Sequence, residues 1–248
     1  MSNYDQNLLL AINETYKQLF APDHYDRKRS SKKVDQLHYT IQRHLDMELS
    51  GSGFELFSKI TDKSEKKVHG YYFDKKTDIS VYDNRTKQMV ATIEFKWLMS
   101  SVQKNTVNSI TNMIGESTNI RKTGLKTYWI YCIRNVTPVY NNGGLITSTY
   151  KIDENFIDKY RSMYKDNLNS DVNLPNALCL NIIKDDVEMG KLKSKRELEV
   201  AYDQYCKEDK LNVGFDKNVE LEINGLYINN YNKFIKMICE DIKNGKSK

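Results

Sequence analysis

The spacing of hydrophobic residues predicts a chain in which helices alternate with strands. Apolar residues recur at helical spacing over residues 4–20 and 34–49, and a shorter amphipathic helix is expected over 54–60. Three strands, a helix and a strongly apolar strand follow, with expected ranges 68–73, 77–82, 89–97, 102–121 and 125–133. A three-strand meander followed by a helix and another strand predicts an α/β fold with a mixed β-sheet flanked by helices.

The remainder of the chain continues this alternation. Two asparagines and two glycines at 141–144 predict a plain turn. Further helices are expected over 153–164, 194–210 and 232–243, and strands over 177–183 and 219–228, the last containing the turn signal Asn224-Gly225. Because no repeat and no long linker interrupts the pattern, we expect a single domain over 1–248. Its core would span about 45–135, with additional C-terminal helices and strands over 185–248.

The second and third strands carry acidic residues in register with each other. Side chains of a strand alternate between faces, so Glu94 and Lys96 share one face of the third strand. The apolar residues Ile93, Phe95 and Trp97 take the other face. With the hairpin turn centred on Thr86, the expected cross-strand pairs are Asp78–Glu94, Val81–Ala91 and Asp83–Met89.

The pairing of Asp78 with Glu94 calls for a compensating positive charge. Like charges directly opposite each other destabilise a sheet unless a cation or a shared proton lies between them. A divalent metal held by Asp78 and Glu94, with Lys96 beside it, would compensate the two negative charges and give these polar residues a role in chemistry. The competing interpretation is an ordinary amphipathic hairpin whose outer face is wet, with Glu94 and Lys96 as solvated charges.

This segment resembles the core of the PD-(D/E)xK nuclease superfamily, and among its members a type II restriction endonuclease. The matching pieces are Asp78, the run Glu94-Phe95-Lys96, and the polar passages 100–108 and 113–121. Thr77 stands where the family's motif has proline. The resemblance covers roughly residues 45 to 135 and implies a restriction-endonuclease-like fold.

The resemblance also implies an activity and a cofactor. It implies magnesium-dependent, sequence-specific hydrolysis of phosphodiester bonds in double-stranded DNA by a homodimer, since such enzymes usually act on palindromic sites. Asp78 and Glu94 would bind Mg²⁺ together with the main-chain carbonyl of Phe95, and Lys96 would orient the attacking water. Magnesium prefers oxygen ligands and retains several waters, so one or two carboxylates suffice to hold it.

Two further sets of side chains are candidates around this core. In the resembled enzymes a glutamate from a preceding helix often completes the site, and Glu55, at the start of the expected helix 54–60, is a better candidate than Glu48. DNA contacts are expected just past the catalytic strand, because amide and basic side chains there can reach base edges or phosphates. The expected DNA-contacting residues are Ser101, Gln103, Lys104, Asn105 and Asn108.

Composition changes this picture only slightly. A net charge of +5 permits a polyanionic partner without demanding one. Five of the seven residues over 27–33 are basic and lead into an expected helix, where they could bind phosphates. The basic cluster over 191–196 is more typical of a solvated face. The four cysteines are widely scattered and are expected to be reduced core thiols. The four histidines show no metal-binding spacing and are expected to be structural or surface residues.

The sequence also bears on location and leaves two other functions open. No apolar run approaches the ~20 residues of a membrane helix, and the first residues lack a signal-peptide pattern, so we expect a cytoplasmic protein. One alternative function is a repair or structure-selective nuclease on the same core. The other is a non-catalytic DNA-binding protein that keeps this fold.

Overall fold

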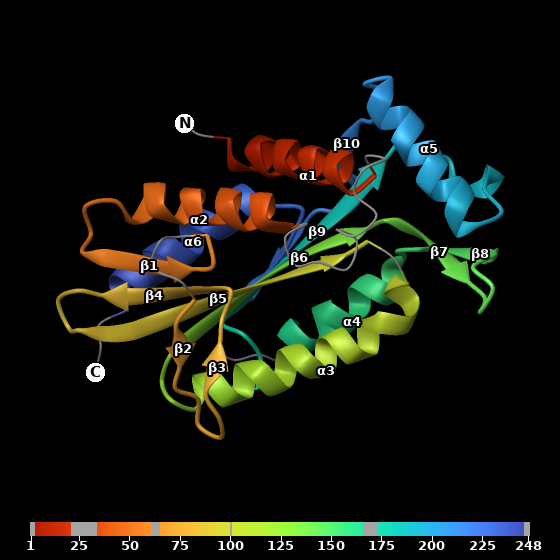
Figure 1. The fold of residues 1–248 in the computed structure, drawn as a ribbon. Helices are drawn as coiled ribbons and strands as arrows, with labels where there is room; N and C mark the ends of the chain where they lie inside the picture. Colours follow the sequence, from red (N-terminus) through yellow and green to blue (C-terminus); the bar gives the residue numbers. More distant parts are fainter. Residues whose placement is uncertain (1–2, 21–33, 61–64, 100, 166–172, 246–248) are drawn as a thin grey trace.

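One mixed β-sheet forms the centre of the fold in the computed structural model, which describes residues 3–20, 34–60, 65–99, 101–165 and 173–245 (Figure 1). Within these residues, eight strands form the sheet in the order β1-β4-β5-β6-β9-β12-β11, and β10 pairs with β9. The strands are β1 (Phe54–Ser58), β4 (Ile79–Asp83), β5 (Gln88–Leu98), β6 (Lys126–Arg134), β9 (Ala177–Asp185), β10 (Val213–Phe215), β11 (Leu221–Ile223) and β12 (Leu226–Ile228). Two small hairpins lie outside it, formed by β2 (Lys67–Val68) with β3 (Lys75–Lys76) and by β7 (Val136–Tyr140) with β8 (Ile146–Lys151).

The direction of strand pairing changes at β5. Strands β1, β4 and β5 pair antiparallel, whereas β5, β6, β9 and β12 pair parallel. Parallel strands are normally covered on both faces and therefore read as continuous apolar runs. The run Tyr128–Ile133 of β6 follows this rule, since every one of its side chains is buried.

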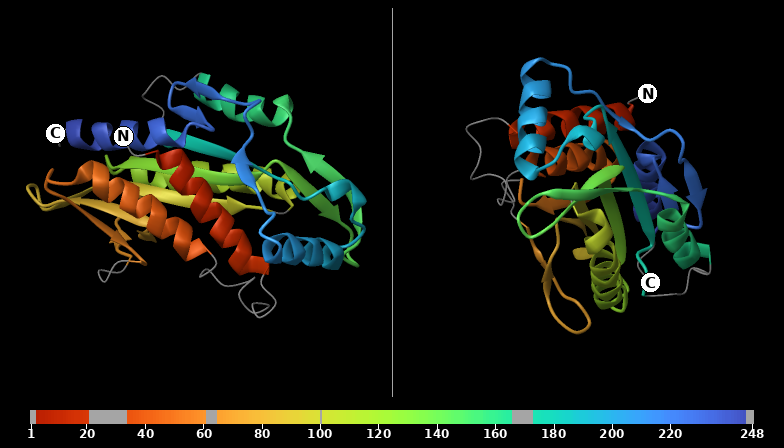
Figure 2. Two further views of the ribbon diagram at one scale, coloured as in Figure 1. Left: turned by 90° about the horizontal axis from the view of Figure 1, so that it is seen from above. Right: turned by 90° about the vertical axis from the view of Figure 1, so that its right-hand side faces the viewer.

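Helices cover both faces of the sheet (Figure 2). One apolar core contains residues of α1 (Tyr4–Phe20), α2 (Asp35–Leu49), α5 (Lys195–Lys207) and α6 (Tyr231–Asn244). The second core contains residues of α3 (Val102–Arg121) and α4 (Glu154–Lys165). The expected α/β fold with a mixed, helix-flanked sheet is confirmed. No helix in the described part of the chain combines the length and apolar character of a transmembrane segment.

Two expected elements are wrong, and four short strands, β3, β7, β8 and β10, were not expected. Residues 54–58 form strand β1, not a helix, because Leu56 and Ser58 alternate inward beneath α2, where Ser58 hydrogen-bonds Gln42. The strand expected over 68–73 is instead the end of β2 and an exposed turn, since the buried side chain of Asn119 binds the backbone of this turn. The short 3-10 helix η3 (Met189–Lys191) and the strands β7 and β8 had no clear periodicity in the sequence.

The expected register of the β4–β5 hairpin is confirmed at one end and shifted at the other. Val81 pairs with Ala91 as expected, and Ile79 pairs with Ile93. Asp83 pairs with Gln88 rather than with Met89, because a β-bulge after Val81 places one extra residue in β5. The end of the hairpin that leads to Asp78 keeps the expected register.

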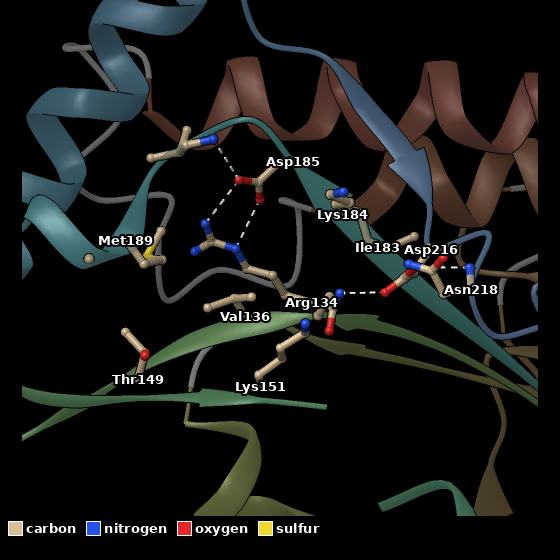
Figure 3. Close-up of a pocket in the computed structure, with 13 residues that line it drawn as sticks. Arg134, Val136, Thr149, Lys151, Ile183, Lys184, Asp185, Met189, Asp216 and Asn218 are labelled. Atoms are coloured by element: carbon tan, nitrogen blue, oxygen red, sulfur yellow. Dashed lines mark hydrogen bonds and ion pairs between the residues drawn. The ribbon is translucent and has the colours of Figure 1, made fainter. Parts of the chain in front are cut away.

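A buried ion pair joins the ends of β6 and β9 to the helices above them. Arg134 donates to both carboxylate oxygens of Asp185, at 2.9 and 3.1 Å, and the side chains are only 5% and 1% exposed (Figure 3). The hydroxyl groups of Tyr16 in α1 and Tyr202 in α5 donate to the same carboxylate, at 3.4 and 2.8 Å. These four side chains fix α1 and α5 on the sheet.

Replacing Asp185 by asparagine is expected to destabilise the fold strongly. The substitution leaves the guanidinium of Arg134 buried without a counter-charge, which costs about 3–5 kcal/mol. Urea denaturation followed by circular dichroism would measure the loss. The control is Asp203→Asn, which removes an exposed ion pair with Lys207 and should change stability by less than about 0.5 kcal/mol. Equal effects of the two substitutions would contradict a structural role for the buried pair.

Candidate active site

Charged side chains from four elements meet on the α3 face of the sheet. They are Asp78, Glu94 and Lys96 from the β4–β5 hairpin, Lys75 from β3 and Glu116 from α3, and we call these five residues the acidic centre. The first three were expected from the sequence. Lys75 and Glu116 were not.

Asp78 lies immediately before β4 and contacts the backbone of β5. Extending the pairing of Ile79 with Ile93 by one residue places Asp78 opposite Glu94. The N–H of Phe95 donates to Oδ2 of Asp78 at 2.8 Å. The carboxylate therefore lies at the point where β4 stops pairing with β5. Asp78 therefore lies beside β5, where its charge acts on Glu94, although Asp78 itself lies just outside the strand.

Glu94 and Lys96 share a face of β5, as the alternation predicts. Phe95 packs in the core beneath α1 and α2, whereas Lys96 lies on the other face with its Nζ 5.3 Å from the centroid of the Trp129 ring. Trp129 pairs with Glu94 across β5 and β6 and is fully buried. Because Glu94 is only 5% exposed, the interpretation of a wet outer face with a solvated Glu94 is wrong.

Lys75 connects two acidic side chains of the acidic centre, Glu94 and Glu116. Its Nζ is 3.1 Å from Oε1 of Glu94 and also pairs with Oε2 of Glu116. The same ammonium lies 5.7 Å from the centroid of the Trp129 ring. Only Gly115-Glu116, in the passage that carried the resemblance, could have drawn attention to Glu116. No local sequence pattern marked Lys75, because an acidic residue close to a lysine is frequent in this lysine-rich chain.

Burial dominates the electrostatics of the acidic centre. Burial raises the pKa of Glu94 to about 8; Lys75 opposes this rise, and the charges of Asp78 and Glu116 add to it. For Lys75, burial lowers the pKa, but the two glutamates outweigh burial and hold the pKa above its ordinary value. At neutral pH the ammonium is therefore charged and held by Glu116, while Glu94 is largely protonated. Neighbouring groups whose pKa values are both perturbed by burial and by each other are common at functional sites.

The donor set suits a magnesium ion better than a softer metal. In the described part of the chain no group of three or more histidine, cysteine, aspartate or glutamate side chains is arranged to hold a metal. Mg²⁺ requires fewer, because it keeps several waters. Asp78 and Glu94 supply two oxygen ligands, and their mutual repulsion is what a divalent cation relieves. The carbonyl of Phe95 points to the same side as its N–H, toward Asp78.

The structure does not bring the expected glutamates into the acidic centre. Glu55 lies in β1, not in a helix, and pairs with Tyr82. Tyr82 is four residues along β4 from Asp78, a separation of about 13 Å. Glu48 lies near the end of α2, on the opposite side of the sheet, where its Oε1 accepts a hydrogen bond from Tyr4 at 2.7 Å. Sequence reasoning failed here because it assigned the wrong element to residues 54–60.

The expected DNA-contacting residues occupy the first two turns of α3. The side chains of Gln103, Lys104, Asn105 and Asn108 are exposed, and Ser101 is half-buried at the helix start. The helix passes close to Lys96 of the acidic centre. The carbonyl of Ser109 accepts a hydrogen bond from Tyr131, which pairs with Lys96 in the neighbouring strand. These residues therefore face solvent on the element that covers the acidic centre.

The remaining expectations about charged and sulfur-containing side chains have mixed outcomes. The basic stretch 27–33 lies outside the described residues. In the second basic cluster, Lys191 pairs with Glu188, consistent with a solvated surface. All four cysteines are free, and three of them are buried. His38 packs edge-on against Phe95; burial lowers its pKa, and the charge of Asp78 opposes this shift.

A cavity of about 300 Å³ lies away from the acidic centre, at the ends of β6 and β9 (Figure 3). Arg134, Lys151, Lys184, Asp185 and Asp216 are among its lining residues. Arg134 is neutralised by Asp185, and Asp216 accepts a hydrogen bond from Asn135. Arg134 is five residues along β6 from Trp129, a distance of about 17 Å. The acidic centre is therefore the stronger candidate for chemistry, and the cavity belongs to a separate part of the sheet.

The raised pKa of Glu94 predicts how stability depends on pH. A carboxyl group whose pKa rises from 4.5 in the unfolded chain to about 8 in the fold stabilises the folded state below the lower value. That contribution is lost between about pH 4.5 and pH 8, at about 1.4 kcal/mol per pH unit. Glu94→Gln cannot ionise, so its free energy of unfolding should exceed that of the unaltered protein increasingly from pH 5.5 to 8.5. Parallel urea denaturation curves in EDTA would measure this difference, and a constant difference would contradict the shift.

Comparisons with protein-family models, with curated proteins and with solved structures found no match to this chain. The chemistry of the acidic centre must therefore be argued from its own geometry.

Proposed function

We propose that this chain is a magnesium-dependent, sequence-specific endonuclease that hydrolyses phosphodiester bonds in double-stranded DNA, as type II restriction enzymes do, and that it acts as a homodimer. One observation carries the proposal. Asp78 bonds the backbone of β5 and its charge acts on Glu94, while Lys96 lies on the same face of β5 as Glu94, over Trp129. This is the arrangement that the resemblance to the PD-(D/E)xK superfamily implies.

The arrangement of the elements around the acidic centre supports the proposal. The chain runs from helix α2 through strand β1, the small β2–β3 hairpin and strands β4 and β5 to helix α3 and strand β6. Within the main sheet this is a helix, three strands, a helix and a strand, the order that the resemblance implies for the nuclease core, with β1 in place of the strand expected over 68–73. The antiparallel strands and the parallel strand β6 meet at β5, which carries Glu94 and Lys96.

The residues of the acidic centre divide the proposed chemistry among them. When bound, Mg²⁺ would polarise the scissile phosphate and lower the pKa of a bound water. Asp78, Glu94 and the carbonyl of Phe95 would hold the ion. Lys96, fixed over Trp129, would orient the attacking water and stabilise negative charge that develops on the phosphate. Glu116 gives Lys75 a second partner, so Glu94 can release this lysine without leaving a buried ammonium unpaired.

The surface of α3 supplies the groups that would bind duplex DNA. Lysine and the backbone of a helix start favour phosphate contacts, which position the protein. Exposed asparagine and glutamine can form paired hydrogen bonds with adenine in the major groove. Gln103, Asn105 and Asn108 have this chemistry and are exposed. A second copy of the chain would present the same surface to the other half of a palindromic site.

Substitutions in the acidic centre should remove cleavage but not DNA binding. Asp78→Asn and Lys96→Ala are each expected to lower the cleavage rate by about 100-fold or more, and EDTA should abolish cleavage. Duplex affinity, measured by fluorescence anisotropy, should change little because the surface of α3 is intact. Lys159→Ala, which removes an exposed lysine of α4, is the control and should cut normally. Undiminished cutting by the Lys96 variant would contradict the assignment.

The substrate can be identified from the ends of the cleavage products. Unmethylated phage DNA incubated with the protein and MgCl₂ should yield discrete fragments whose sequenced ends share one short motif. Cutting only at flaps or mismatches would instead support the repair or structure-selective alternative. Duplex binding without any magnesium-dependent cutting, unchanged by Asp78→Asn and Lys96→Ala, would support the non-catalytic alternative.

A further inference from the structure

Three consecutive aromatic side chains project from the turn of the β2–β3 hairpin. Tyr71, Tyr72 and Phe73 are 62%, 63% and 57% exposed. Within the described residues, no other large apolar side chains that are this exposed follow one another in sequence. Large aromatic side chains normally gain stability by burial. We call residues 70–73 the aromatic turn.

Hydrogen bonds to α3 hold the backbone of the aromatic turn in place. Asn119 is buried, and its Oδ1 accepts from the N–H groups of Tyr72 and Phe73 at 2.8 and 3.3 Å. Its Nδ2 donates to the carbonyl of Phe73 at 2.9 Å, and its own carbonyl accepts from the N–H of Tyr71. A Cβ on Gly70 would lie 2.1 Å from the same Nδ2, so only glycine fits there. The aromatic side chains are thus presented outward by a fixed backbone.

One lysine lies directly against the aromatic turn. The Nζ of Lys122 lies 5.2 Å and 4.9 Å from the ring centroids of Tyr71 and Tyr72, and it donates to the hydroxyl of Tyr72 at 2.6 Å. In the strands of the hairpin, Lys75 is taken up by the acidic centre, whereas Lys67 and Lys76 are exposed. The surface therefore combines flat aromatic groups with positive charge. That combination suits a nucleic acid strand, whose bases stack on aromatic rings while its phosphates pair with lysines.

The aromatic turn is directly connected to the acidic centre. Phe73 is two residues before Lys75, the lysine that pairs with Glu94 and Glu116. Figure 1 shows the hairpin lying beside α3, the helix that carries Glu116 and Asn119. Two residues of chain span at most about 7 Å, and Asn119, which holds the turn, is three residues from Glu116 on α3. A base bound on the aromatic turn would thus lie close to a phosphate at the acidic centre.

We propose that the aromatic turn is a binding site for an unstacked nucleobase next to the scissile phosphate. This inference rests on the proposed function, and it specifies the substrate as DNA with a base displaced from the helix stack, either in an unpaired strand or in a duplex opened by the protein. Stacking depends little on which base is bound, because every base has a flat face. The aromatic turn would therefore position the strand, while α3 supplies sequence preference.

Photocross-linking of the unaltered protein tests the contact directly. A single-stranded oligonucleotide carrying 5-iodouracil is irradiated with the protein in EDTA, so that no metal-dependent cleavage occurs. After trypsin digestion, mass spectrometry should find the cross-link on the peptide spanning residues 68–75, because lysine precedes and ends this segment. Cross-links confined to other peptides would overturn the inference.

Affinity measurements provide the second test. Tyr71→Ala, Tyr72→Ala and Phe73→Ala are combined in one variant, which should bind the oligonucleotide about fivefold or more weakly. The slope of log affinity against log salt should not change, because every lysine is retained. A control variant combines substitutions by alanine at Leu10, Leu145 and Val200, which are similarly exposed elsewhere, and should bind normally. Unchanged affinity of the aromatic variant would contradict the inference.

Two further outcomes separate this inference from the proposed function. If the unaltered protein cuts DNA and the aromatic variant binds and cuts equally well, the aromatic turn is no base-binding site and the proposed function stands. If the cross-link falls on residues 68–75 but no cleavage occurs with magnesium, the proposed nuclease activity fails and the base contact stands. A change from dimer to monomer in sedimentation, with unaltered DNA binding, would show that the turn joins two copies of this chain, and would overturn the inference.

Discussion

The contact of the buried Lys75 ammonium with Glu94 and Glu116 is the interaction on which the candidate active site depends. A buried ammonium is unfavourable unless carboxyl groups partner it. Lys75 brings the ammonium from outside the main sheet, and its partners come from β5 and α3. One ammonium therefore connects β5, the β2–β3 hairpin and α3. The positions of all three elements are tied to the charge of Lys75.

The surrounding sheet explains why the carboxyl group of Glu94 is buried at all. β5 is the strand at which antiparallel pairing gives way to parallel pairing, and parallel strands require cover on both faces. Helix α3 provides that cover and places Glu94 over Trp129 rather than in water. Burial then raises the pKa of the carboxyl group, and Asp78 adds to the rise. The proposed metal site and its structural cost thus arise from the same geometry.

The β2–β3 hairpin links recognition to chemistry in the proposed mechanism. Its turn is held against α3 by Asn119, and its second strand carries Lys75. A ligand that contacts the exposed rings of the turn thus binds the same hairpin whose Lys75 contacts Glu94 and Glu116. The Arg134–Asp185 pair, in contrast, holds α1 and α5 in place at the far ends of β6 and β9 and has no contact with this hairpin in the described structure.

The sequence by itself determined the local elements and the faces of the strands. Helical spacing located α1, α2, α3, α4 and α6 closely, and the period of two placed Glu94 and Lys96 together on β5. It did not determine Lys75 or Glu116, because their pairing joins segments about 20 and 40 residues apart and leaves no local pattern. The strand at 54–58 was mistaken for a helix for the same reason: its inward face is defined by α2, not by its own five residues. Local periodicity is encoded in neighbouring residues, whereas burial of a charge is decided only when distant elements pack together.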